Sequence, residues 1–135
     1  MSWTPYIALS DGTIFGSSTA NGQFAVLGDY IWFQCRVVAG VPSYISSCTG
    51  NVGIYGLPYV GTYSPPACSV GLCSGFNANS SWNGYGAYID GHTSYIQLAF
   101  MFTENNVGTW QLLRSVHLVG ASRSVDVNVS GIYRW

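Results

Sequence analysis

The sequence carries very little charge. Of its 135 residues, 7% are charged, against roughly 25% in an average soluble domain. It contains no lysine, four arginines and a single glutamate, Glu104, and its formal net charge is −1. Neutralising nucleic-acid phosphates needs clustered basic residues, so we expect no nucleic-acid partner. A weakly charged surface favours association, so we expect copies of the chain or a larger assembly to cover part of it.

Long apolar runs and helical patterns are also missing. The apolar runs fall far short of the ~20 residues that cross a bilayer, so we expect no membrane partner. The opening residues, Met1–Pro5, lack the basic and apolar regions of a signal peptide, which indicates synthesis in a cytosol. No window sets apolar residues at helical spacing opposite a charged face, so we expect strands in place of helices.

The clearest strand signal surrounds Gly28-Asp29. The runs Gln23–Leu27 and Tyr30–Val38 flank this pair, which predicts two strands joined by a two-residue turn. In the second run, alternate residues are uniformly apolar and predict the core face: Ile31, Phe33, Cys35 and Val37. The opposite row holds two large aromatic side chains, which predicts a subunit contact formed by Tyr30, Trp32 and Arg36.

The rest of the chain predicts a single domain, 1–135, of eight to ten short strands, as in a sandwich, jelly roll or barrel. Trp3–Leu9 is an edge strand or extended arm, because Pro5 cannot donate to a ladder. Gly16–Gly22 is small and polar, which predicts a loop, and Asp90-Gly91 predicts a primed hairpin turn. Further expected strands are Val52–Tyr55, Tyr59–Tyr63, the pair Ala67–Val70 and Leu72–Phe76, Tyr85–Ile89, Thr93–Phe100 and Ser124–Trp135.

Four cysteines raise the questions of metal and disulfide. Only Cys68 and Cys73 approach the close spacing of zinc ligands, so we expect no metal and no cofactor. In an oxidising environment, Cys68 and Cys73 are a possible disulfide, with Cys35 and Cys48 as a second pair. Cys35 also fits the core face as a small apolar residue.

Catalytic patterns are absent from the sequence. His117 and Asp126 can be combined with a serine on paper, but no G-x-S-x-G or strand-turn-helix pattern accompanies them. Three carboxylates adjoin a glycine, which indicates turn chemistry: Asp11, Asp29 and Asp90. We therefore expect no enzymatic activity.

Aromatic residues make up 16% of the chain. Trp82 lies in a Ser/Asn/Gly-rich stretch that predicts a loop, with Tyr85 close by. Trp and Tyr offer large rigid contact surfaces, so Trp82 and Tyr85 form a candidate ligand-binding loop for a sugar or a protein. The alternative is packing of these side chains beneath loops.

Several stretches together resemble a small β-domain of bacteriophage virion proteins. They are the opening Trp3–Tyr6, the unit Gly22–Gln34 with its Gly-Asp-Tyr-Ile-Trp-Phe-Gln core, the strand closing on Leu57-Pro58, and the ending Gly131–Trp135. The resemblance implies an all-β, jelly-roll-like antiparallel β-sandwich that forms a homotrimer. Such domains end tail-fibre and minor tail proteins, or decorate capsids alone.

The resemblance implies a virion protein made in the host cytoplasm and binding itself, the major capsid protein or another virion protein. A first strand close to the start of the sequence favours a capsid decoration, or cement, protein, with Trp3, Pro5 and Tyr6 as the arm that contacts the capsid. The alternative is a tail-fibre receptor-binding module that recognises a host glycan.

Overall fold

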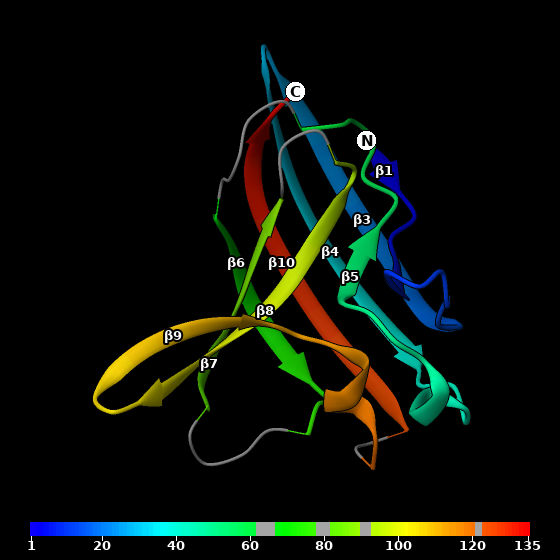
Figure 1. Ribbon diagram of the computed structural model, residues 1–135. Helices are drawn as coiled ribbons and strands as arrows, with labels where there is room; N and C mark the ends of the chain where they lie inside the picture. The colour runs from blue at the N-terminus through cyan, green and yellow to red at the C-terminus, as the bar shows by residue number, and fades with distance from the viewer. Residues whose placement is uncertain (62–66, 78–81, 90–92, 121–122) are drawn as a thin grey trace.

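The chain folds into strands that run across two layers (Figure 1). The computed structural model describes residues 1–61, 67–77, 82–89, 93–120 and 123–135. The strands are β1 (Ser2–Trp3), β2 (Tyr6–Leu9), β3 (Ser17–Leu27), β4 (Tyr30–Gly40), β5 (Val52–Tyr55), β6 (Ala67–Ser74), β7 (Trp82–Ile89), β8 (Tyr95–Glu104), β9 (Val107–Leu112) and β10 (Ser124–Arg134). Two short 3₁₀ helices accompany them, η1 (Ile45–Ser47) and η2 (Ser115–Leu118). Within the described ranges, no helix is long and apolar enough to cross a membrane.

The strands follow the order β1-β3-β4-β10-β6-β7-β8-β5-β2, with β9 added to β8, and every pairing is antiparallel. One sheet contains β1, β3, β4 and β10, and the other contains β7, β8, β5, β2 and β9. Strand β6 passes from one sheet to the other, because its later residues pair with β10 while Ala67 and Cys68 pair with β7. The arrangement confirms the prediction of an all-β, jelly-roll-like antiparallel sandwich.

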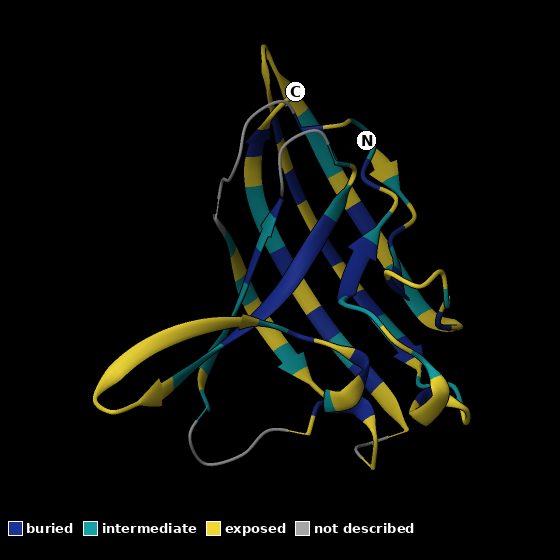
Figure 2. Ribbon diagram, viewed as in Figure 1, coloured by how far each residue is buried: buried dark blue, intermediate teal, exposed yellow. Residues whose placement is uncertain are grey.

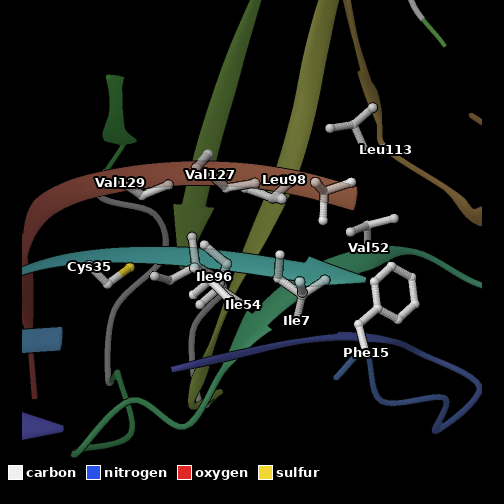
Figure 3. Close-up of a cluster of buried hydrophobic side chains, with 14 of the residues drawn as sticks. Ile7, Phe15, Cys35, Val52, Ile54, Ile96, Leu98, Leu113, Val127 and Val129 are labelled. Carbon is white, nitrogen blue, oxygen red and sulfur yellow. The ribbon is translucent and has the colours of Figure 1, made fainter. Parts of the chain in front are cut away.

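Alternating apolar residues build the core between the two sheets. In β4 the predicted inward row is buried at 0 to 4% exposure: Ile31, Phe33, Cys35 and Val37. Val125, Val127 and Val129 of β10 are likewise fully buried. The facing sheet contributes Ile54, Ile96 and Leu98 (Figure 3). The period of two in the sequence therefore decides which face of each strand is removed from water.

The N-terminal segment is extended, as predicted, but it is not a free arm. β1 pairs with β3 and β2 pairs with β5, so this segment lies at both ends of the strand order. Pro5, between the two strands, is buried. Because Pro5 has no N–H, it fits a crossing between sheets where no ladder bond is needed. Two residues thus join the outer edges of the sandwich.

The hairpin around Gly28-Asp29 is confirmed, since β3 and β4 pair from Leu27 opposite Tyr30 onward and Gly28 has a φ of +64°. The prediction of a loop at Gly16–Gly22 is wrong, because β3 begins at Ser17 and pairs along the whole of β4. Its partner strand is long and strongly β-forming, and ladder pairing with it outweighs the local preference of small polar residues.

The middle of the chain also differs from the prediction. Ala67–Val70 and Leu72–Phe76 form the single strand β6 instead of a pair, with Gly71 as the extra residue of a bulge opposite β10. Residues 59–61 form no strand, and the rest of the predicted strand Tyr59–Tyr63 lies outside the described residues. Ile89 pairs with Ile96, so β7 and β8 are joined by a longer connection than the predicted turn at Asp90-Gly91, whose residues also lie outside the described ranges.

Trp3 packs against Gly22 and so holds the N-terminal segment on β3. A substitution at Gly22 tests how much this packing stabilises the domain. A Cβ on buried Gly22 would lie 2.4 Å from the Trp3 indole nitrogen. We expect Gly22→Ala to expel Trp3 and lower the free energy of unfolding by about 1–3 kcal/mol, the usual cost of overpacking. Urea unfolding followed by tryptophan fluorescence measures this. Gly84→Ala, where nothing lies within 4 Å, is the control, and an equal loss in a Trp3→Ala background would contradict the assignment to Trp3.

Candidate functional site

A pocket of about 520 Å³ lies where β7, β8 and β9 face η2. The lining side chains combine aromatic rings with amide, hydroxyl, imidazole and carboxylate groups: Asn77, Trp82, Phe100, Phe102, Thr103, Glu104, Gln111 and His117. Phe100, Phe102 and Glu104 alternate along β8, so they share one face of that strand. The pocket therefore forms where this face of β8 runs beyond the closely packed core.

Stacked rings form the apolar part of the pocket. The Trp82 and Phe100 rings stack with their centroids 3.8 Å apart and their planes 15° apart. His117 stands edge-on to both, 5.4 Å from Trp82 and 5.0 Å from Phe100. Tyr85 also meets Trp82 in a T-shaped contact, with the ring centroids 6.0 Å apart. These contacts hold the aromatic surface in one orientation.

The imidazole of His117 is held in one form by its neighbours. The backbone N–H of Arg114 donates to Nδ1 at 2.9 Å, which leaves Nε2 as the proton-bearing nitrogen of the neutral ring. Partial burial and then the charge of Arg114 lower the pKa of His117 below its ordinary value. His117 is therefore a neutral hydrogen-bond donor at pH 7.

Hydrogen bonds hold two asparagines beside the pocket. The N–H of Asn77 donates to the His117 carbonyl at 2.7 Å, which ties this residue to η2. The Asn83 amide donates to the hydroxyl of Thr103 and so orients it. An aromatic surface surrounded by oriented amide, hydroxyl and imidazole groups suits a polar ligand with one flat apolar face.

Of the two predicted ligand-binding residues, Trp82 lines this pocket and Tyr85 contacts Trp82 without lining it. Trp82 begins β7, so the loop prediction is wrong for Trp82, whereas Tyr85 lies in β7 as the expected strand Tyr85–Ile89 requires. Their strand continues the ladder with β8, which the Ser/Asn/Gly composition conceals. Trp82 packs on Phe100, as the packing alternative expects, and it also lines the pocket. The alternation of Phe100, Phe102 and Glu104 is the sequence signal that could have located the pocket residues of β8.

A second surface lies on the outer face of β4. Tyr30 and Trp32 are 50% and 36% exposed, and Trp32 lies between Ala25 of β3 and Ile132 of β10 in the ladder. Leu27, opposite Tyr30, is 57% exposed. We call Leu27, Tyr30, Trp32 and Ile132 the outer patch.

Arg36 lies in the same outward row of β4 as Tyr30 and Trp32, and it is held by an acid of β10. Its guanidinium donates to both carboxylate oxygens of Asp126, at 3.1 and 2.8 Å. Asp126 is therefore paired with Arg36, and His117 with the Arg114 N–H, so the two residues considered for a catalytic triad have different partners. The pairing with Arg36 also keeps the pKa of Asp126 below its ordinary value.

The predicted arm residues all pack within the domain. Trp3 covers Gly22, and Tyr6 stacks on Tyr55 with a centroid distance of 5.7 Å. Tyr55 in turn stacks on Tyr95 at 4.9 Å, so three rings form a ladder across β2, β5 and β8. These contacts leave no projecting N-terminal arm.

The predicted disulfides are not formed, since all four cysteines are free thiols. Cys68 and Cys73 lie on the same strand, β6, five positions apart. A strand rises about 3.3 Å per residue, so their Cα atoms are about 16 Å apart, well beyond the ~7 Å that a disulfide spans. Burial raises the pKa of both thiols to about 12, which makes them poor nucleophiles. Among the described residues, no cluster of His, Cys, Asp and Glu could hold a metal ion.

Comparison with known proteins gives one structural likeness. No family model and no curated protein matches the chain. The fold is similar to the crystal structure of Dettilon tailspike protein, with a TM-score of 0.75 and 21% sequence identity. The match covers 99% of this chain and 23% of the tailspike chain, so this chain spans about a quarter of that protein's length. At this identity the likeness establishes the fold.

The lowered pKa of His117 predicts a specific pH dependence. The ordinary pKa of histidine is 6.5. Below this pH, the His117 side chain takes up a proton in the unfolded chain that it binds less tightly in the folded chain. This contribution to the free energy of unfolding is complete above pH 6.5 and is lost as the pH falls. We expect His117→Asn to reduce the decline in the free energy of unfolding between pH 7 and pH 5, as measured by denaturant titrations. His92→Asn, the other histidine, is the control, and parallel curves for wild type and His117→Asn would contradict this role.

Proposed function

We propose that this chain is a structural domain of a bacteriophage virion protein, located on the tail, where it binds a host-surface glycan as a homotrimer. The observation that carries this proposal is the likeness of 99% of the chain to part of a tailspike protein. The sequence resemblance to phage virion domains supports the same origin independently. Integration of Trp3, Pro5 and Tyr6 into the sandwich removes the arm that favoured a capsid role.

A glycan is the ligand class that suits the pocket beside Trp82. Sugar rings present an apolar face of C–H groups to aromatic rings and hydroxyl groups to amides and carboxylates. The Trp82–Phe100 stack supplies the first feature, and Asn77, Gln111 and Glu104 supply the second. Binding without catalysis is part of the proposal. Glycoside hydrolysis ordinarily uses two carboxyl groups, and Glu104 is the one carboxylate among the described lining residues.

Capsid decoration is the second candidate function. It is favoured by the low charge of the chain and by the outer patch, which a capsid lattice could cover. Immunogold labelling of intact particles with antibody against this chain separates the two. We expect label on the tail, and label on the head with capsids that lose stability in its absence would establish decoration instead.

Glycan binding can be tested at the pocket rim. We expect Gln111→Ala and Glu104→Gln each to weaken binding roughly 2- to 12-fold, the effect of one net hydrogen bond of about 0.5–1.5 kcal/mol. A bacterial glycan array identifies the ligand, and calorimetry measures its affinity. Thr109→Ala, an exposed change on β9 outside the pocket, serves as the control. Equal affinities for all four proteins would exclude this pocket as the binding site.

The outer patch can be tested as the contact around the trimer axis. We expect the wild-type chain to have the mass of three copies in light scattering. Trp32→Lys places a charge in the middle of the apolar patch, so we expect it to shift the mass toward one copy. Gln34→Lys, two residues along the same exposed row, should leave the mass unchanged. A trimer that survives Trp32→Lys would place the contact elsewhere.

A further inference from the structure

A second pocket adjoins the one beside Trp82, which we call the aromatic pocket. The hairpin of β8 and β9 is exposed from Thr103 to Gln111, and the chain runs from its base to η2 (Figure 2). At this base, Gln111 lines the aromatic pocket of about 520 Å³ and also a pocket of about 300 Å³. The remaining lining residues of the smaller pocket are Asn51, Leu112 and Arg114. We call it the arginine pocket.

The backbone of Arg114 is fixed at the start of η2. Its N–H donates to Nδ1 of His117 at 2.9 Å, and its carbonyl accepts from the His117 N–H at 3.0 Å. Arg114 also pairs with Asn51 in an isolated antiparallel β-bridge. His117 lines the aromatic pocket and Arg114 lines the arginine pocket, so the two pockets meet at these hydrogen bonds as well as at Gln111. Because the hydrogen bonds use only the backbone of Arg114, its side chain is not needed to hold η2.

The guanidinium of Arg114 has no acid beside it. The two ion pairs that join described residues contain Arg36 and Arg134, and Arg114 is exposed. Its charge reaches the aromatic pocket because, after burial, it is the second cause that holds the pKa of His117 below its ordinary value. The amide side chains of Asn51 and Gln111 add neutral donors and acceptors to the arginine pocket. This pocket therefore carries a positive charge that no group of the chain neutralises among the described residues.

The carboxylate of the aromatic pocket lies at the other end of the two pockets. Gln111 pairs with Phe100, and Glu104 lies four residues farther along β8, toward the hairpin tip. At about 3.3 Å per residue, Glu104 is about 13 Å from the Gln111–Phe100 pair. Arg114 follows Gln111 in the opposite direction, toward η2. A negatively charged group is therefore repelled near the tip and attracted near η2.

We propose that the arginine pocket binds the carboxylate of an acidic sugar, a uronic or sialic acid, while a neutral sugar of the same glycan occupies the aromatic pocket. The forked N–H donors of arginine match the two oxygens of a carboxylate. One guanidinium among neutral amides balances a single negative charge, which favours a carboxylate over a doubly charged phosphate. Glu104 disfavours the acid at the far end of the aromatic pocket. The inference rests on the proposed glycan binding and gives the glycan its chemical class.

Pairs of glycans that differ only in their acid test the proposal. The probes are bacterial oligosaccharides that contain glucuronic, galacturonic or sialic acid, each arrayed beside the same oligosaccharide with its carboxyl groups reduced to alcohols. At pH 7 we expect the wild-type chain to bind the acidic member roughly 2- to 5-fold more tightly, as an exposed ion pair allows, and added salt to reduce this preference. Equal or tighter binding of the reduced member, or binding confined to neutral glycans, would overturn the inference and leave glycan binding intact. Failure to bind any glycan would overturn both.

Substitution of Arg114 assigns the preference to one side chain. Arg114→Gln removes the guanidinium but keeps the backbone bonds to His117, so we expect it to bind the acidic and reduced members equally. Arg114→Lys keeps the charge and should keep part of the preference. Arg123→Gln removes the same charge from an exposed arginine that lines neither pocket, and it should match the wild type. Calorimetry measures the affinities, and circular dichroism verifies folding. A preference that survives Arg114→Gln, or that Arg123→Gln abolishes equally, would overturn the acidic-sugar site.

Discussion

The pairing of β4 with β10 is the contact on which the rest of the structure depends. The two strands pair along eleven residues, from Tyr30 opposite Arg134 to Gly40 opposite Ser124. Along this ladder every inward pair is apolar or small, and Gly131 leaves room for Phe33 and Cys68, which lie 3.2 Å from where its Cβ would be. A shift by one residue would bury Asp126 and Arg36 and expose the valines, so the register is strongly fixed.

Closure of the sandwich follows from this central pair. β3 and β6 add to its two sides, and each leads toward the other sheet, β3 through β1 and the Pro5 crossing and β6 through Ala67 and Cys68, which pair with β7. Tyr133 ties the layers together, because its ring meets Phe33 at 5.8 Å and its hydroxyl donates to the Tyr59 carbonyl at 3.0 Å. The core needs no charge, which is how a chain with 7% charged residues folds.

Local pattern predicted the fold wherever one face of a strand is buried. The inward row beginning at Ile31 could be predicted because period-two alternation directly reflects removal from water. Prediction failed where pairing with a distant strand decides the structure. Pairing with β4 makes Ser17–Gly22 a strand, and pairing with β10 makes Gly71 a bulge. Of the site, Trp82 and Tyr85 were predicted, but His117 reaches them only through tertiary packing that no spacing encodes.

The pocket and the hairpin share one origin, the length of β8. Ile96 and Leu98 are buried in the core, Phe100 meets Trp82 at its margin, and Glu104 stands in water at the tip. A strand that ended at Phe100 would complete the sandwich but would leave neither the aromatic pocket nor the projection. The distal part of the ribbon gains little from burial, and within the chain it is supported by its ladder and by Trp110, which packs over Gly86 of β7. The same ribbon therefore lines the pocket on one side and, among the described strands, leaves the outer edge of β9 unpaired.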